Sequence, residues 1–321
     1  MSILQPIREV VFKTRHRLRN TYPVWYRVLN RKSRGFWNEH GRITQDNIGK
    51  TIVETLKKEG IAVTDVATLF PEMSFDEMRR FAFDTLKKPG IEQEIAEHEK
   101  MIQERVETGA VRAGKRKHVK DFIVEPWGST GNNILPALDN PFIKANLDDG
   151  LIQIVGSYLG LAPRFRAFSL RLTLTSPDGA KEYFSQRWHR DNEDKRLCKM
   201  FIYMTDVLDD ADGPFKYIKE SHAMGRYGNV FPSRPPSSLY PDLGGVEKVI
   251  PADVVQTCFG RAGTVVLADT GGLHKGGYTT SKPRFMYTGT FFTDASVSPI
   301  HLKYEGDIKS LSPLAKFALE R

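Results

Sequence analysis

The sequence predicts a mainly β protein with helical additions, an α+β fold built as a sandwich or jelly roll. Before Gly160, apolar residues recur at helical spacing. After it, short runs of β-branched and aromatic residues, punctuated by Gly and Pro, continue to Phe292. No glycine-rich phosphate loop joins a strand to a helix, so the sequence does not indicate a nucleotide-binding Rossmann fold.

Five helices are predicted from apolar periodicity and from their caps. Ser74 and Glu77 have the spacing of a capping box, and Asn140-Pro141 pairs an N-cap with a proline in the first turn. Gly60 provides a C-terminal stop for an earlier helix. The predicted helices span 3–19, 46–59, 74–88, 91–107 and 140–159.

Seven strands are predicted from β-branched runs and from alternation. Phe168 to Leu174 alternate apolar and polar residues, as a strand with one buried face does. The segment from Gly225 to Gly245 breaks this rhythm with four prolines, and it is either a lid over a substrate or an inert surface excursion. The predicted strands span 61–64, 168–174, 199–204, 215–218, 254–258, 264–268 and 284–292.

Cysteine content and hydropathy indicate the compartment. Two cysteines, Cys198 and Cys258, do not make a disulfide framework and are compatible with a reducing cytoplasm. No apolar run approaches the ~18–20 residues that span a bilayer, and the N-terminus lacks the apolar core of a signal peptide. We expect a cytoplasmic protein, either free or peripheral on the inner face of the membrane.

The formal net charge of +8 favours an anionic partner. Residues 3–19 have the spacing of a basic amphipathic helix, which either lies on an anionic membrane or docks on the rest of the protein with a solvated charged face. The basic stretch from Ala110 to Lys120 has no aromatic residues for stacking on bases, so no nucleic acid is expected.

A metal site is indicated by Trp188-His189-Arg190-Asp191. In an extended backbone, His189 and Asp191 point to the same side and reach one ion together if a third ligand arrives from elsewhere. His274, in a glycine-rich stretch, is the candidate third ligand. Two His and one carboxylate on one face of an octahedron leave three positions open, as in non-haem Fe(II) oxygenases.

Arg284 follows ten positions after His274, at the start of a predicted strand. An arginine placed there is able to hold the far carboxylate of a dicarboxylate by two points while the other end of that molecule chelates the metal. The ordered set of two His, one Asp and one Arg is more specific than a lone His-x-Asp motif.

With these residues in order, the sequence resembles the phytanoyl-CoA dioxygenase-like family of Fe(II)/2-oxoglutarate-dependent oxygenases over roughly 48–293. The resemblance implies a double-stranded β-helix, cupin-like core at about 161–295. Together with the basic N-terminal residues, it leads us to expect a basic amphipathic N-terminal segment, 1–45, and a dioxygenase domain, 46–321. It also implies that His189, Asp191 and His274 are catalytic iron ligands, that Arg284 binds 2-oxoglutarate, and that O2 is consumed. Position 276 is Gly where many relatives have Ser or Thr, so Thr279 or Thr280 is the candidate for that hydroxyl.

The resemblance implies hydroxylation of an unactivated C–H bond, with release of succinate and CO2. Asp191 is retained, whereas related halogenases have a small residue there, so hydroxylation is favoured over halogenation. Desaturation, cyclisation and epoxidation use the same metal site and stay open. Two other classes also remain: a non-catalytic metal-binding or membrane-associated protein, and a Zn-dependent hydrolase using the same triad.

The substrate is expected to be a small molecule, or one tethered to a carrier, lipid or sugar, that bears an anionic group. This expectation rests on the basic balance of the chain. The candidate contacts are Lys115, Arg116, Lys117 and Arg171.

Overall fold

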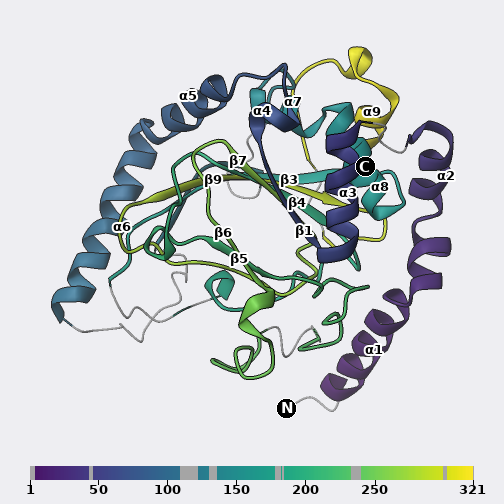
Figure 1. The fold of residues 1–321 in the computed structure, drawn as a ribbon, viewed down its shortest axis with the longest axis horizontal. Coiled ribbons are helices and arrows are strands. Elements are labelled where there is room, and N and C mark those ends of the chain that lie inside the picture. Colours follow the sequence, from purple (N-terminus) through teal and green to yellow (C-terminus); the bar gives the residue numbers. More distant parts are fainter. Residues whose placement is uncertain are drawn as a thin grey trace.

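We describe the fold from a computed structural model of the chain. It describes residues 4–42, 46–108, 122–129, 136–177, 182, 184–232, 240–298 and 302–320. In this part of the chain, two antiparallel sheets face each other, and helices cover the outer side of the larger sheet (Figure 1). Lys115, Arg116 and Lys117, predicted as substrate contacts, lie outside the described residues.

The larger sheet has six strands in the order β1-β7-β4-β9-β3-β2, with every neighbouring pair antiparallel. Alternate residues serve two cores. On β4, Met200 and Ile202 pack toward the helices, whereas Phe201 packs between the sheets. The strands are β1 (Ile61–Asp65), β2 (Ile123–Gly128), β3 (Arg164–Thr173), β4 (Cys198–Tyr203), β7 (Thr264–Ala268) and β9 (Arg284–Phe292).

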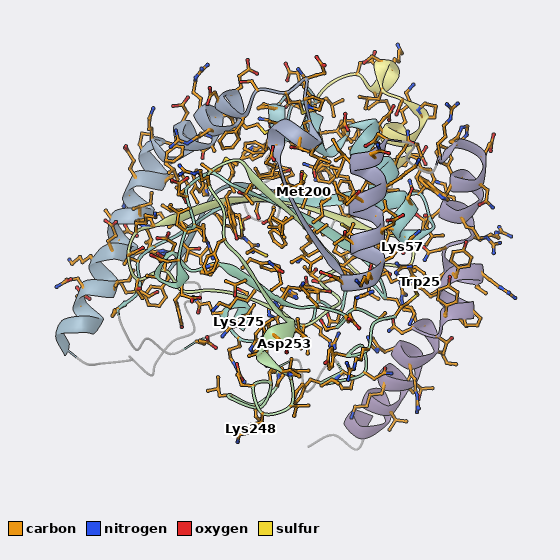
Figure 2. All side chains as sticks on the ribbon, in the orientation of Figure 1. Trp25, Lys57, Met200, Lys248, Asp253 and Lys275 are labelled. Carbon is orange, nitrogen blue, oxygen red and sulfur yellow. The ribbon has the colours of Figure 1, made fainter. Side chains whose placement is uncertain are left out.

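The smaller sheet has the order β6-β5-β8 and consists of β5 (Phe215–Ile218), β6 (Val255–Cys258) and β8 (His274–Gly276). An isolated antiparallel bridge joins His189 to His274. The segment around His189 therefore lies beside β8 as a further strand of the smaller sheet. Met200 on the larger sheet and Lys275 on the smaller one mark the two layers in Figure 2.

The order in which the chain visits the sheets is that of a jelly roll. From β3 through the His189 segment to β9, it crosses from one sheet to the other at every connection except β5 to β6. Each sheet thereby receives four of these eight strands, and β1 and β2 extend the larger sheet. Such closure by two facing sheets defines the fold, so the predicted double-stranded β-helix core is confirmed.

Helices close the outer face of the larger sheet over an aromatic cluster. The ring centroids of Phe142 and Tyr287 lie 4.3 Å apart, and those of Trp127 and Phe168 lie 4.2 Å apart. The helices are α1 (Leu4–Arg19), α2 (Arg31–His40), α3 (Asn47–Glu59), α4 (Val66–Leu69), α5 (Phe75–Leu86), α6 (Pro89–Thr108), α7 (Pro141–Asn146), α8 (Asp149–Leu159) and α9 (Pro313–Leu319), with a π-helical segment, η1 (Val24–Leu29), between α1 and α2. No helix in the described ranges combines the length and apolarity that crossing a membrane requires.

Short 3-10 turns complete the connections: η2 (Phe184–Gln186), η3 (Asp210–Asp212), η4 (Ala252–Val254) and η5 (Ile308–Ser310). The predicted caps are present. The Ser74 hydroxyl accepts from the amide of Glu77 at 3.3 Å, and Gly60 ends α3 with a φ of +81°.

One predicted helix was wrong. The range 140–159 forms two helices, α7 and α8, separated at Leu147 and Asp148. The Asp148 carboxylate accepts from the amide of Leu151 at 2.9 Å and so caps a new helix instead of continuing the first one.

The N-terminal segment runs along one edge of the molecule (Figure 1). Trp25, on η1, is buried, and its indole N–H donates to Asp194 at 2.7 Å. The Ser33 hydroxyl donates to Asp294 at 2.8 Å. The segment from Trp25 onward therefore shares contacts with the jelly-roll core, and the division of the chain at residue 45 stays a prediction.

Candidate metal centre

His189 and His274 lie directly opposite each other on neighbouring antiparallel segments. The amide of each donates to the carbonyl of the other at 3.0 Å, so both side chains project from the same face. Asp191 follows two residues later on that face, and its amide donates to the carbonyl of Thr270 at 2.8 Å. Pairing of the 189–191 segment with the 270–274 segment is what brings these residues together.

The donor atoms of the three side chains converge. One ligand atom each from His189, Asp191 and His274 lies within 4.8 Å of the others. The Nδ1 atoms of the two imidazoles face backbone carbonyls, of Arg187 at 2.8 Å and Gly272 at 3.0 Å. A proton on Nδ1 makes both of these contacts hydrogen bonds and leaves both Nε2 lone pairs for an ion, as is usual for metal-binding histidines.

Electrostatics keep the three donors in their metal-binding protonation states. Burial lowers the pKa of His274 to about 3, and burial also lowers the pKa of His189. Burial alone raises the pKa of Asp191, but nearby Lys199 and the two imidazoles outweigh it and hold that pKa below the ordinary value. Two neutral imidazoles and one carboxylate fit Fe(II), with three positions left open.

Lys199 lies in the same space. It belongs to β4, where Phe201 also faces the interior between the sheets, and its Nζ lies 2.6 Å from the Oδ2 of Asp191. No other carboxylate in the described ranges forms an ion pair with Lys199. The site therefore contains a protein cation in contact with the carboxylate of a candidate metal ligand.

Arg284 is a buried cation with unmatched hydrogen-bonding groups. It is 6% exposed, and its Nη2 lies 3.4 Å from the hydroxyl of Thr173. Its Nε and Nη1 have no hydrogen-bond partner among the described residues, and no described carboxylate forms an ion pair with it. Burial lowers the pKa of Arg284. A buried charge without a partner is destabilising by several kcal/mol, so this position is built for an anion.

The two cations start from distant positions on the larger sheet. Lys199 contacts Asp191, whereas Arg284 faces Gly276, two residues after His274, where an added Cβ would lie 3.8 Å from Nη2. The register of β4 and β9 pairs Lys199 with Thr290, six positions along β9 from Arg284. At about 3.4 Å per residue, the backbones of the two cations are roughly 20 Å apart along the strands.

Arg190 points away from the donors and fixes the loop behind them. Its guanidinium donates to five backbone carbonyls, those of Ser221, Tyr227, Val230, Phe231 and Gly271. Burial lowers its pKa to about 10. The loop 221–231 is thereby tied to the residue between His189 and Asp191, while residues 233–239 lie outside the described ranges.

Asp269 organises the turn before His274. Its buried carboxylate accepts from the hydroxyl of Tyr158 and from the amide of Gly271, and its backbone carbonyl accepts from the hydroxyl of Tyr217 at 2.9 Å. Burial raises the pKa of Asp269. This network fixes the chain five residues before His274.

The four candidate site residues, His189, Asp191, His274 and Arg284, all lie in or beside one space between the sheets. Thr279 and Thr280 were the candidates for a hydroxyl that contacts 2-oxoglutarate. The hydroxyl of Thr279 donates to the carbonyl of Lys282. The hydroxyl that lies beside Arg284 is that of Thr173. Arg171, predicted to contact the substrate, pairs with Glu125 at 3.2 Å.

Sequence reasoning missed Lys199, Arg190 and Asp269. Lys199 could have been noticed, because it is the one charged residue in the otherwise apolar or aromatic run Cys198–Tyr203. The other two act through backbone carbonyls and buried hydroxyls, which no local pattern reveals.

Three solved structures are distant likenesses of this chain. The non-heme alpha-ketoglutarate-dependent carbocyclase SnoK from nogalamycin biosynthesis has a TM-score of 0.46 and 16% identity, over 84% of this chain and 92% of its own. EctD from S. alaskensis with bound Fe has a TM-score of 0.45 and 17% identity, over 85% and 86%. HygX from Streptomyces hygroscopicus, with nickel and 2-oxoglutarate bound, has a TM-score of 0.44 and 15% identity, over 76% and 86%.

No protein-family model matches the chain, and neither does any curated protein sequence. The fold and the chemistry therefore rest on the topology and geometry of this chain, and the phytanoyl-CoA dioxygenase-like family stays a resemblance carried by its motifs.

Proposed function

We propose that the chain is an Fe(II)/2-oxoglutarate-dependent dioxygenase that hydroxylates an unactivated C–H bond. The observation that carries the proposal is the unpaired, buried guanidinium of Arg284 beside a His-Asp-His donor set. A metal-dependent hydrolase has a use for the three donors but none for a carboxylate clamp. The three open positions on an ion held this way suit a chelating co-substrate and O2.

His189, Asp191 and His274 would hold the metal, and Arg284 would bind the distal carboxylate of 2-oxoglutarate through a charge-assisted fork. Bound there with 2-oxoglutarate and O2, Fe(II) supplies the oxidative decarboxylation that releases succinate and CO2. Phe215, whose ring centroid lies 5.6 Å from that of His274, and Phe201 packed on it provide apolar walls that exclude water from the site.

The test is formation of succinate from 2-oxoglutarate by the purified protein with Fe(II), with and without O2. We expect O2-dependent succinate, lost in His274→Ala and retained in His40→Ala, a histidine remote from the site. A protein that hydrolyses esters or amides with Zn(II) and forms no succinate would instead be a hydrolase. A protein that binds metal but does neither would be non-catalytic.

We further propose that Lys199 selects a substrate with an anionic group, such as a carboxylate. The ammonium of Lys199 pairs with Asp191 at 2.6 Å. With Asp191 holding a metal, the ammonium of Lys199 would no longer be neutralised by that carboxylate, and an anionic group of the substrate would pair with it. Arg284 is assigned to 2-oxoglutarate, and its backbone lies six positions along β9 from Thr290, the partner of Lys199.

This substrate class is tested with pairs of compounds that differ only in a carboxylate or its neutral amide. We expect carboxylates to stimulate succinate release more than their amides do, and Lys199→Met to lose that preference. Lys216→Met is the matched control, since Lys216 on β5 pairs with Asp210 at 2.6 Å and lies between the inward-facing Phe215 and Tyr217. Equal stimulation by both members of each pair in the parent protein would contradict the assignment of Lys199.

A further inference from the structure

The positive charge of the chain is concentrated at its N-terminus. Residues 1–35 contain nine Lys and Arg and one Glu, so their net charge is +8. Residues 36–321 contain 38 basic and 38 acidic side chains and are neutral overall. The whole net charge of the protein therefore belongs to the segment that includes α1 and η1.

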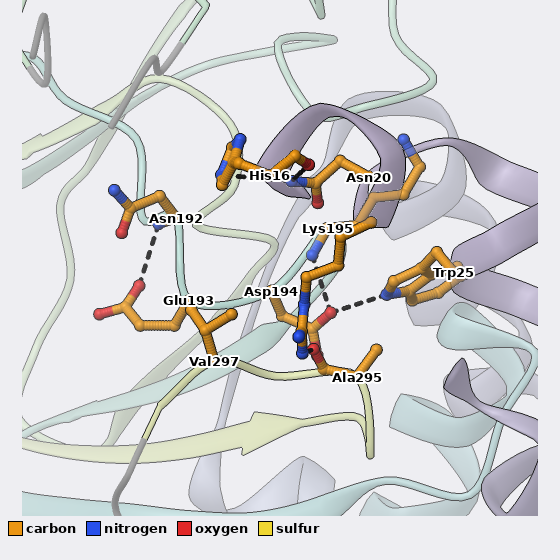
Figure 3. A pocket seen from close by; sticks show the side chains of 10 residues that line it. His16, Asn20, Trp25, Asn192, Glu193, Asp194, Lys195, Ala295 and Val297 are labelled. Atoms are coloured by element: carbon orange, nitrogen blue, oxygen red, sulfur yellow. Dashed lines mark hydrogen bonds between the residues drawn. The ribbon is translucent and has the colours of Figure 1, made fainter. Parts of the chain in front are cut away.

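Helix α1 docks on the body with its polar side. His16, Arg19 and Asn20 line a small cavity of about 10 Å³ together with Asn192 and Lys195, and Figure 3 shows His16, Asn20, Asn192 and Lys195 around it. The guanidinium of Arg19 donates to the carbonyl of Ala295. The helix thus lies behind the loop that follows Asp191, and polar contacts hold it there.

The opposite side of α1 presents apolar residues to solvent. Val10 is 62% exposed, Val11 48% and Leu18 57%. At 100° per residue, these three positions fall within a 100° arc, so they form one stripe. This arrangement is the reverse of an ordinary amphipathic surface helix, whose apolar stripe faces the core.

Cations accompany the stripe. Lys13 lies three positions after Val10, and Arg17 directly precedes Leu18. Both cations are exposed. Beyond the helix, Val28 is 66% exposed, next to the exposed Arg27. The outward edge of the N-terminal segment therefore combines apolar side chains with positive charge.

We infer that this face of α1 binds the surface of an anionic membrane. An apolar stripe flanked by Lys and Arg is the composition of helices that lie in the lipid interface, with the stripe among the acyl chains and the cations at anionic headgroups. A second copy of the chain would place two charges of +8 against each other. Nucleic acid would use the cations and leave the stripe in water. The inference does not depend on the proposed oxygenase activity.

The experiment measures sedimentation of the full-length protein with vesicles of phosphatidylcholine alone or mixed equally with phosphatidylglycerol. We expect binding to the anionic vesicles, with the partition coefficient falling roughly tenfold in the triple variant Val10→Ser, Val11→Ser, Leu18→Ser. Lys13→Gln with Arg17→Gln is expected to lower it by a similar factor, and high salt to lower it further. The altered side chains are exposed, so circular dichroism and the melting temperature serve as checks of folding.

Matched controls alter equally exposed residues elsewhere. Met224→Ser, Leu208→Ser and Val249→Ser remove apolar side chains that are 61%, 53% and 58% exposed, and Lys58→Gln with Lys88→Gln removes two exposed cations. Both control variants should partition like the parent protein. Equal loss in test and control variants, or no vesicle binding by the parent protein, would overturn the inference. So would a concentration-dependent dimer without vesicle binding that the α1 triple variant alone dissociates, or binding to single-stranded RNA in place of vesicles.

Discussion

The ammonium of Lys199 lies 2.6 Å from the Oδ2 of Asp191, in the space between the two sheets. At the proposed metal site, a metal ion and Lys199 would compete for this one carboxylate. The same contact that holds the pKa of Asp191 low also opposes the arrival of a second cation.

Replacing Lys199 by Met should tighten binding of Mn(II) in the absence of co-substrate, by on the order of tenfold, because a competing positive charge is removed. Calorimetric titration of the metal-free protein measures this affinity. Lys216→Met should bind Mn(II) like the parent protein. A weaker affinity in Lys199→Met would show that the lysine supports the ligand carboxylate instead of competing with the ion.

The stability of the metal-free protein should depend on pH through its buried histidines. Burial lowers the pKa of His274 to about 3 and lowers the pKa of His189 and His222 from 6.5. Between the folded-state pKa values and 6.5, the unfolded chain binds more protons than the folded chain, so the free energy of unfolding rises with pH. This stability is complete above about pH 6.5 and is lost as the pH falls toward 3.

Urea unfolding with a chelator present, at several pH values between 4 and 8, tests this dependence. His274→Gln should flatten the slope below pH 6.5, because one of the histidines with a lowered pKa is absent. A slope that is the same in His274→Gln and the parent protein would mean that other groups control it.

Arg190→Met should lower the free energy of unfolding by roughly 3 kcal/mol, since several buried carbonyls lose a charged donor at once. Metal affinity should fall as well, because the residue between two ligands no longer anchors the loop 221–231. Arg226→Met is the control: Arg226 is an exposed arginine of that loop whose guanidinium lies 5.4 Å from the Tyr227 ring. Unfolding and metal titrations that do not distinguish the two variants would remove the anchoring role.

The effect of an N-terminal deletion on stability should depend on whether Trp25 is retained. Removing residues 1–18 leaves the bond from Trp25 to Asp194 intact, so the protein should fold, whereas removing residues 1–35 also removes the contacts of Asn30 and Ser33 and should destabilise it strongly. Trp25→Phe isolates one bond and should lower the free energy of unfolding by about 1–3 kcal/mol. Thermal unfolding compares the three proteins, and equal stability of both deletions would contradict this account.

Much of the fold was predictable because its elements carry local patterns. The alternation and β-branched runs predicted β5, β7 and β9 with their observed bounds. By contrast, β8 consists of only His274, Lys275 and Gly276. These residues form a strand because they pair with β5, and no local sequence pattern shows that pairing. The bend at Asp148 was missed because apolar periodicity continues across it.

Four residues of the candidate site were predictable from the sequence, and Lys199 was not. His189 and Asp191 share a face by strand alternation alone, and the order of His274 and Arg284 along the chain completed the set. Lys199 is not part of that ordered set, but the pairing of β4 with β7 and β9 places it next to Asp191. Its contact with Asp191 depends on the three-dimensional closure of the barrel, which the sequence pattern does not specify.

In the proposed enzyme, Arg284 binds the far carboxylate of 2-oxoglutarate while His189, Asp191 and His274 hold the metal. The measurement that tests this claim most directly is an anaerobic titration of 2-oxoglutarate into the Fe(II)-loaded protein, compared with Arg284→Met and Arg284→Lys. We expect one 2-oxoglutarate per chain, an affinity loss of roughly 2–5 kcal/mol in Arg284→Met, and partial recovery in Arg284→Lys, because an ammonium does not reproduce the fork. Binding of 2-oxoglutarate with equal affinity by the parent protein and Arg284→Met, both loaded with one Fe(II), would contradict the claim.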